Sequence, residues 1–324
     1  MACFWIAGPG MRFDCEIMHQ SVLAAEVVAS LDPRPGGVFA DGTAGSGGHA
    51  AMLAERIGPQ GRILVIDRDL DALKRARERL RTYGAVCVFV HGNYGDLSAH
   101  AAACGFAALD GVLLDLGVSS DQLDTPERGF SFRADGPLDM RMDASNGPTA
   151  ADLLNSASEE ELAKWFVCYG EEPLARRIAR AIVAARKAAA LTRTADLASV
   201  VARAKGGRRG RIDPATQVFQ ALRIVVNGEL DALDRGLEAG LNLLKPGGRL
   251  AVISFHSLED RRVKGCFRRH AGRWEALEAG GENWIGEQPA VAVLTRKPVM
   301  AGETEVADNP RARSAKLRVA VRRE

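Results

Sequence analysis

Apolar positions along the first third of the chain show two kinds of pattern, one typical of helices and one typical of strands. Helical spacing, with apolar residues every three or four positions, marks three segments: 21–31, 50–57 and 69–81. Short β-branched runs indicate four buried strands: 37–40, 62–66, 85–90 and 111–114. Because strands and helices of this length alternate, the pattern predicts an α/β fold. Its parallel, doubly wound sheet should hold a ligand at the carboxyl ends of the strands.

The alternation stops after the fourth expected strand. Residues 117–146 are rich in Gly, Asp, Ser and Pro, which predicts a loop. Residues 149–204 are rich in Ala, Glu and Arg at helical spacing and show almost no strand pattern. The last third returns to alternation. A helix is expected at 230–244, a tight turn at 245–248, and strands at 249–255, 291–295 and 317–321.

These changes of pattern divide the chain into three parts. We expect one sheet domain, made of residues 19–123 and 217–324, interrupted by a helical insert at 124–216. Residues 1–18 are expected to be a disordered extension. An apolar run at 4–7 has no basic region before it and is too short for a signal or membrane segment. Translation from Met1 and translation from Met11 both fit the sequence.

The distribution of charge, rather than its total, indicates a polyanionic partner. The whole chain carries a formal charge of only +2. Residues 173–213 hold eleven basic and two acidic residues, a net +9, so the remainder carries −7. Four of these basic residues lie among glycines, in a pattern that suits phosphates: Lys205, Arg208, Arg209 and Arg211. Three others also fit the solvated face of a helix: Arg176, Arg177 and Arg180.

Six cysteines are scattered along the chain without a Cys-x-x-Cys pair, at positions 3, 15, 87, 104, 168 and 266. This spacing supports neither a zinc site nor a disulfide framework. We therefore expect reduced thiols, no metal and a cytoplasmic location.

A glycine-rich turn follows the first expected strand, in the segment Asp41-Gly-Thr-x-Gly-x-Gly-Gly48. Such glycines let the backbone approach a ligand closely, in dinucleotide enzymes as well. The Asp41 carboxylate beside them suits an ammonium group, which the methionine part of S-adenosylmethionine carries. Asp67 could accept hydrogen bonds from ribose hydroxyls, or only cap a helix. Tyr94 could line an adenine pocket, or only fill the core. Together these positions favour a methyltransferase over a dehydrogenase.

Further motifs run from about His19 to Arg318. They are Asp41-Gly-Thr-x-Gly-x-Gly-Gly-His49, Leu114-Asp-Leu-Gly-Val-Ser-Ser120 with Gln122-Leu-Asp124, Arg128-Gly-Phe-Ser-Phe132, Gly136-Pro-Leu-Asp-Met-Arg-Met-Asp143, Phe219-Gln-Ala-Leu-Arg-Ile224, Ile253-Ser-Phe-His-Ser-Leu-Glu-Asp260 and Asn309-Pro-Arg-Ala-Arg-Ser314. Together they resemble the bacterial ribosomal small-subunit RNA (cytosine-N4)-methyltransferases of the H series, also called MraW. Gln217 stands where that family is expected to carry arginine.

The resemblance implies a class I, Rossmann-like, S-adenosylmethionine-dependent methyltransferase sheet with an inserted all-helical domain that recognises RNA. It implies methyl transfer to N4 of a cytidine in the decoding region of 16S ribosomal RNA, within the small ribosomal subunit. It also implies cofactor contacts at Gly47, Gly48, His49, Asp67, Tyr94, Asp115 and Gln122. The oligomeric state stays open, with a homodimer among the options.

The group that receives the N4 proton is not assigned by the sequence. The amine lone pair of cytosine is delocalised into the ring, so a nearby acceptor is needed to localise it. Asp115 follows the fourth strand, where such acceptors usually lie, but it could serve the cofactor alone. His256 is the second candidate, with a structural hydrogen bond as its alternative. The Asp-Pro-Pro-Tyr type of motif is absent.

Other functions remain to be weighed against this one. No cysteine follows a proline, and carbon-5 methylation of cytosine generally uses a thiolate in such a pair. An amine or hydroxyl acceptor is therefore favoured. A DNA or small-molecule methyltransferase is one alternative, although the large basic insert argues against a small molecule. An RNA-binding ribosome-assembly factor with a vestigial cofactor pocket is another.

Overall fold

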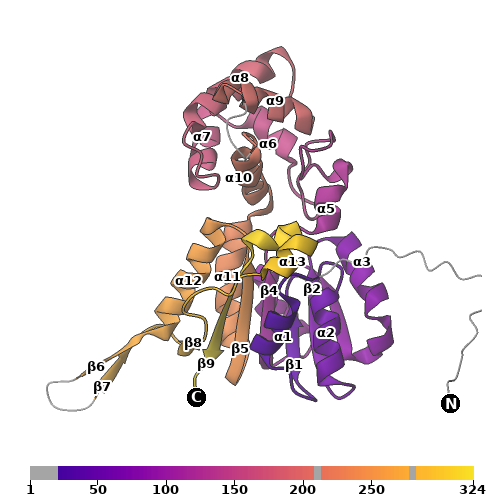
Figure 1. Ribbon diagram of the computed structural model, residues 1–324, viewed down its shortest axis with the longest axis vertical. Helices are drawn as coiled ribbons and strands as arrows, with labels where there is room; N and C mark the ends of the chain where they lie inside the picture. Colours follow the sequence, from indigo (N-terminus) through magenta and orange to yellow (C-terminus); the bar gives the residue numbers. More distant parts are fainter. Residues whose placement is uncertain (1–20, 208–212, 277–281) are drawn as a thin grey trace, which may run out of the picture.

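The computed structural model describes residues 21–207, 213–276 and 282–324, and its sheet forms the lower half of the molecule in Figure 1. The seven strands of this sheet are β1 (Val38–Asp41), β2 (Arg62–Asp67), β3 (Cys87–His91), β4 (Leu109–Asp115), β5 (Leu244–Ser254), β8 (Val291–Val293) and β9 (Lys316–Arg322). They lie in the order β3-β2-β1-β4-β5-β9-β8. The terminal extension predicted for residues 1–18 lies outside the described residues.

The first five strands of the sheet are parallel, and β9 inserts antiparallel between β5 and β8. The direction in which successive strands are added to the sheet reverses at β1, since β2 and β3 lie on one side of it and β4 and β5 on the other. Open α/β sheets bind ligands at such a switch point, outside the carboxyl ends of the strands. The predicted α/β, Rossmann-like sheet is therefore confirmed.

Helices cover both faces of the sheet. One face packs against α1 (Ala24–Leu31), α2 (Gly48–Ile57) and α3 (Leu70–Arg79); the other packs against α4 (Leu97–Ala103), α11 (Glu229–Leu243) and α12 (Ser257–Ala271). Strand β2 illustrates the division, since Ile63 and Val65 enter the first core and Leu64 and Ile66 enter the second. Each such side chain stabilises the fold by roughly 1.5–3 kcal/mol through burial.

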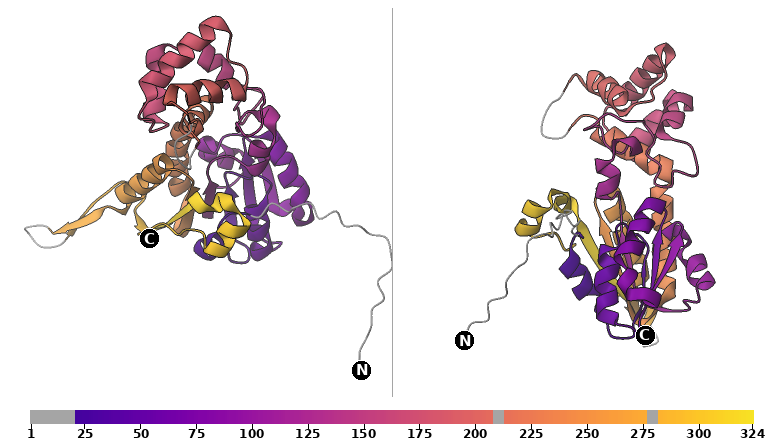
Figure 2. Two further views of the ribbon diagram at one scale, coloured as in Figure 1. Left: turned by 45° about the horizontal axis from the view of Figure 1, so that its top comes forward. Right: turned by 90° about the vertical axis from the view of Figure 1, so that its right-hand side faces the viewer.

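A second group of helices stands above the sheet and has a hydrophobic core of its own (Figure 2). Its members are α6 (Ala150–Ser156), α7 (Glu159–Cys168), α8 (Ala175–Ala188), α9 (Thr194–Lys205) and α10 (Thr216–Asn227). Thr149 and Ser158 form capping boxes that start α6 and α7. The expected boundary at residue 217 falls inside α10, whose Val218 and Phe219 pack in this helical core. Residue 217 therefore lies inside a helix of this group, which continues to Asn227 and is capped by Gly228.

Several short elements have no clear pattern in the sequence. They are α5 (Ser120–Asp124), β6 (Arg273–Ala276), β7 (Glu282–Ile285), α13 (Glu303–Asp308) and the 3-10 turns η1 (Arg81–Val86), η2 (Tyr94–Asp96), η3 (Pro126–Arg128) and η4 (Pro310–Ser314). Strands β6 and β7 pair as a hairpin that projects from the end of α12 (Figure 1). The expected turn at 245–248 lies within the bounds of β5, as an irregularity in its pairing with β4. Across the described ranges, no helix is long and apolar enough to cross a membrane.

A buried asparagine joins the helical group to the segment that precedes α6. Asn227 is 5% exposed, and its Oδ1 accepts a hydrogen bond of 2.8 Å from the Met142 amide. Its Nδ2 donates to the carbonyl oxygens of Met140 and Arg223. The Asn227 carbonyl in turn accepts from Arg68, which follows β2. One residue therefore connects α10, the long loop and the sheet.

We expect Asn227→Ala to lower the free energy of unfolding by about 1–3 kcal/mol, because it leaves a buried amide and a buried carbonyl unpaired. Urea denaturation followed by circular dichroism measures the change. Asn146→Ala is the control, since that side chain is exposed and should be replaceable within about 0.5 kcal/mol. Equal stability of the two variants would contradict the structural role of Asn227.

Candidate active site

A pocket opens at the carboxyl ends of β1, β2 and β4, with a cavity volume of about 170 Å³. Six residues that the sequence predicts as cofactor contacts line it: Gly48, His49, Asp67, Tyr94, Asp115 and Gln122. The seventh, Gly47, is not in the wall. Residues that the sequence does not single out also line it, among them Thr43, Gly45, Ser119, Phe255 and Arg311. The strand ends therefore bring the predicted set together around one cavity.

The glycine-rich turn bends sharply before α2. Gly47 caps this helix with φ of +80°, and a Cβ added there would lie 3.1 Å from the Ala76 Cα of α3. A Cβ on Gly48 would lie 2.0 Å from the Ser21 Oγ. Gly47 thus permits close packing of α2 on α3, while Gly48 and Gly45, the latter with φ of +51°, line the cavity itself.

Asp67 ends β2 and braces the turn. One carboxylate oxygen accepts a hydrogen bond of 2.8 Å from the Gly45 amide, and the other accepts one of 2.8 Å from the Asp69 amide. Burial raises the pKa of Asp67 to about 6, against the opposing effect of these two amides. Each oxygen keeps a further lone pair for a ligand.

Asp41 lies behind the pocket wall rather than in it. Its side chain is fully buried; one oxygen accepts from the Thr43 amide, and the other has no hydrogen-bond partner among the described residues. Burial raises its pKa to about 6, although nearby His49 acts in the opposite direction. An ammonium group in the cavity would therefore feel the Asp41 charge through the turn, without the direct contact that the sequence suggests.

Asp115 and His49 face each other across the pocket floor. The His49 Nε2 lies 3.5 Å from Asp115 Oδ2, and neither ring nitrogen makes a hydrogen bond within the described chain. Burial opposes a charge on the imidazole, but the carboxylates of Asp115 and Asp41 outweigh it and raise the pKa of His49. The Asp115 amide donates to Thr43 Oγ1 at 2.6 Å, which ties β4 to the turn.

Gln122 belongs to a hydrogen-bonded group centred on Asp69. Its Nε2 donates to Asp69 Oδ2 at 2.8 Å, and its Oε1 accepts from the Ser119 amide in a capping box. Arg128 also donates to Asp69 Oδ2, at 2.7 Å, and reaches the carbonyls of Arg141 and Met142. Asp69 therefore fixes both the pocket wall and the loop toward the helical group.

Two further acidic side chains, Glu229 and Glu259, line the pocket. Glu229 opens α11 and accepts two hydrogen bonds of 2.9 Å from the Arg223 guanidinium of α10. Glu259 lies 3.9 Å from the same arginine. Burial would raise the pKa of Glu259, but His256, Arg223 and the backbone amides lower it below its usual value, so it stays ionised. The ring of Tyr94 packs against α11, where a Cβ on Gly236 would lie 2.6 Å from its Cδ2.

His256 occupies a helix cap instead of the cavity wall. Its Nδ1 accepts from the Glu259 amide at the start of α12, and its Nε2 lies 3.1 Å from Glu259 Oε1. Among the wall residues that the sequence missed, Glu259, Asn309 and Arg311 all lie within motifs already quoted for the family. Those motifs therefore held a signal, but their residues had no assigned role.

The basic residues predicted to meet RNA fall in two groups. Arg208, Arg209 and Arg211 lie outside the described residues. Lys205 is described, and its ammonium lies 2.6 Å from the fully buried Glu172 carboxylate and 3.4 Å from Gln217 Oε1. Lys205 is thus engaged within the helical group, and Gln217 also donates to the Glu171 carbonyl.

The pocket has the chemistry of a site for a cationic ligand. Asp67, Asp115, Glu229 and Glu259 line it, and Asp115 Oδ1 is a buried acceptor without a partner in the described chain. A ligand that carries a sulfonium and an ammonium group would supply the missing positive charge. The residues present therefore fit S-adenosylmethionine.

Comparison with known families decides the relationship. The model of the MraW methylase family matches residues 16–323. The chain belongs to the MraW methylase family. Similar curated members are called ribosomal RNA small subunit methyltransferase H. The one from Pelobacter propionicus is 52% identical, covering 93% of this chain and 97% of that protein. The one from Geobacter sulfurreducens is also 52% identical, covering 93% and 98%.

A solved structure of a SAM-dependent O-methyltransferase from Thermotoga maritima aligns with a TM-score of 0.38 at 11% identity, covering 95% of this MraW methylase and 69% of that chain. That likeness is too low to bear on function. Membership in the methylase family implies S-adenosylmethionine as the methyl donor.

We expect the affinity of this MraW methylase for S-adenosylmethionine to fall roughly tenfold between about pH 7.5 and about pH 5. Asp67, with its pKa near 6, becomes neutral over that interval and loses its attraction for the cationic ligand. Calorimetric titration across the pH series measures the effect. The raised pKa values of Asp41 and Asp67 also affect the free protein. Both carboxyl groups contribute most to its stability below about pH 4, and that contribution disappears as pH rises through about 6.

Asp41→Asn is the matched control for this series. The variant keeps an oxygen for the Thr43 amide and removes the charge behind the wall. A similar pH dependence in the variant would assign the titration to Asp67, whereas a flat profile would assign it to Asp41. An affinity that does not vary with pH in the wild-type protein would exclude both carboxyl groups.

Proposed function

We propose that this protein transfers a methyl group from S-adenosylmethionine to N4 of a cytidine in the decoding region of 16S ribosomal RNA. The observation that carries the proposal is an identity of 52% along nearly the whole chain with proteins called ribosomal RNA small subunit methyltransferase H. The acidic pocket at the sheet's switch point supports it independently. The partner is the small ribosomal subunit, encountered in the cytoplasm.

The cofactor would be held by the residues gathered at the strand ends. Asp67 is suited to the ribose hydroxyls, and Tyr94 to one face of the adenine pocket. Gly48, His49, Asp115 and Gln122 complete the wall, while Gly47 allows the turn to form. When bound, the sulfonium supplies an electrophilic methyl group. The protein's task is to hold the acceptor nitrogen in line with it and to exclude water.

Asp115 is the acceptor that we propose for the N4 amine. Its Oδ1 is buried and unpaired among the described residues, and it lies at the end of β4. A carboxylate that accepts an N4–H hydrogen bond localises the nitrogen lone pair and later receives the proton released on methylation. His49, beside the other oxygen of Asp115, would hold that carboxylate in place. We propose no direct contact with the base for His256, because its Nε2 faces Glu259.

The helical group is proposed to recognise RNA. Its basic character comes from the segment 173–213, and exposed arginines on α8 and the segment 208–211 are its candidate phosphate contacts. Arg128 and Asn227 link this group to the pocket, so RNA held above the sheet would stand over the methyl donor.

Mass spectrometry of 16S RNA nucleosides tests the activity. Cells that lack this protein should lose N4-methylation of a decoding-region cytidine, and the wild-type gene should restore it. In a single-turnover assay, Asp115→Asn should lower the rate constant of methyl transfer at least about a hundredfold, because a positioned proton acceptor contributes that much to the rate. An unchanged nucleoside profile in the deletion would reject the proposed reaction. RNA binding without turnover would favour an assembly factor.

Replacing Arg208, Arg209 and Arg211 together should weaken subunit binding and reduce the log–log salt slope by up to about three units. Cofactor affinity should not change, since the pocket belongs to the sheet. Filter binding across a salt series measures the slope. The matched comparison is a second triple variant on α8, made of Arg176, Arg177 and Arg180, which are all exposed. If neither triple variant alters binding, the helical group does not contact phosphate through these arginines.

A further inference from the structure

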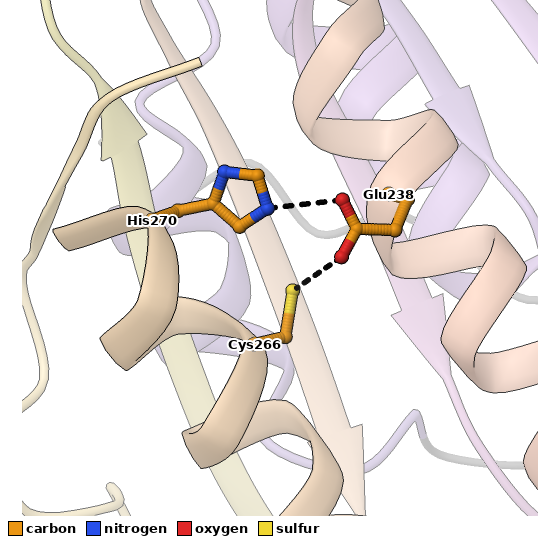
Figure 3. A group of neighbouring side chains, drawn as sticks. All are labelled: Glu238, Cys266 and His270. Atoms are coloured by element: carbon orange, nitrogen blue, oxygen red, sulfur yellow. Dashed lines mark hydrogen bonds and ion pairs between the residues drawn. The ribbon is translucent and has the colours of Figure 1, made fainter. Parts of the chain in front are cut away.

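A separate group of metal-binding side chains meets between α11 and α12, outside the pocket wall (Figure 3). Glu238 comes from α11, and Cys266 and His270 lie one turn apart on α12. The Cys266 Sγ lies 3.7 Å from Glu238 Oε1, and the His270 Nε2 lies 2.9 Å from Glu238 Oε2. Both α12 side chains are almost fully buried, at 2% and 1% exposed.

A fourth donor comes from the chain that follows the hairpin. Glu287 lies after β7, and its Oε2 is 3.4 Å from the His270 Nε2. The Arg269 guanidinium donates to Glu238 Oε1 at 3.2 Å and to Glu287 Oε2 at 3.0 Å. It therefore holds both carboxylates beside the histidine, in the manner of the outer groups that orient metal ligands.

The orientation of the imidazole leaves one nitrogen for a cation. The His270 Nδ1 lies 3.0 Å from the Pro289 carbonyl oxygen. A carbonyl only accepts, so Nδ1 carries the hydrogen. In the neutral ring, Nε2 then presents its lone pair to the Glu238 and Glu287 carboxylates, which also only accept. A positive ion between them, either a proton or a metal, resolves this conflict.

The thiol distinguishes the two ions. A proton on Nε2 would satisfy the two carboxylates and leave Cys266 as a weak donor at 3.7 Å. A thiophilic cation would use sulfur, imidazole nitrogen and carboxylate oxygen together, a donor set that suits zinc rather than magnesium or calcium. Zinc bonds of about 2.0–2.3 Å place tetrahedral donors roughly 3.3–3.7 Å apart. The 3.7 Å from Cys266 Sγ to Glu238 Oε1 and the 3.4 Å from His270 Nε2 to Glu287 Oε2 fit that spacing, and one donor atom from each of Glu238, Cys266 and His270 lies within 4.8 Å of the other two.

We propose that Glu238, Cys266 and His270, with Glu287 as fourth donor, bind one zinc ion. As the Sγ–Zn bond forms, the S–H bond breaks and its proton leaves to solvent, so no oxidant or reductant is needed. The carboxylates are 41% and 50% exposed and provide the path of entry. The sequence misses this site because no two of its cysteines are paired, and Glu238 is remote from α12 in the chain.

A zinc ion here would serve structure, since four protein donors leave no position for a substrate. It would join α11, α12 and the chain after the β6–β7 hairpin at one point. The hairpin's orientation relative to the sheet would then depend on the metal. Binding should accordingly raise the unfolding temperature of the protein.

Cobalt titration of the untagged, full-length protein tests the proposal. Co²⁺ should bind in one equivalent with thiolate-to-metal absorption in the near ultraviolet, and Zn²⁺ should displace it. Cys266→Ser should abolish that absorption, and Glu238→Gln should weaken binding more than about tenfold by removing a charged ligand. Cys87→Ser is the matched control, because that cysteine is also buried but is not part of the proposed donor set.

The outcomes separate the readings clearly. Loss of the absorption in Cys266→Ser but not in Cys87→Ser, with zinc raising the unfolding temperature of wild type and Cys87→Ser but not of Cys266→Ser, supports the site. Absence of the thiolate absorption in the wild-type protein overturns it. The same absorption in Cys266→Ser assigns the metal to another cysteine and also overturns it. If Cys266→Ser does not fold, a Glu238→Gln affinity equal to that of wild type overturns the proposal by itself.

Discussion

Three carboxylates at the ends of adjacent parallel strands impose the main constraint on this structure. Asp41, Asp67 and Asp115 must converge, because β2, β1 and β4 are neighbours in register and run in the same direction. Burial disfavours the charged forms of Asp41 and Asp67 and raises the pKa of each to about 6. The Gly45 and Asp69 amides, the Thr43 turn and the His49 ring offset that cost only in part. The free protein is therefore strained electrostatically where a cation would relieve it, as is common at functional sites.

A few polar contacts join the helical group to the residues that follow β2, next to these carboxylates. Asp69 accepts from Arg128 and Gln122, while Arg68, one residue earlier, donates to Asn227. Two consecutive residues after β2 thus hold both the pocket wall and the helices above it. A change in how the helices sit would act on Asp67 through its immediate neighbours. The helical group and the pocket wall therefore depend on one short piece of backbone.

The sequence predicts the sheet well because its strands are continuous apolar runs, buried on both faces by helices. Asp67, Asp115 and Tyr94 could be placed in advance because parallel strands end at one edge. The position of Asp41 behind the wall could not, since exposure depends on how the turn folds over it. Glu229 and its partner Arg223 escaped prediction because they meet only when α10 packs on α11. The hairpin of β6 and β7 lacks the alternation that marks a half-buried strand.

The insertion point of the helical group has a consequence for folding. Strands β4 and β5 are neighbours in the sheet, yet residues 116–243 separate them in the chain. Closing a loop of that length is entropically costly and slows the pairing of the central strands. Helices α6 to α10 have their own core, so they can collapse locally and bring the ends of the insertion together. On this route, the helices that stand over the pocket would form before the sheet that builds it.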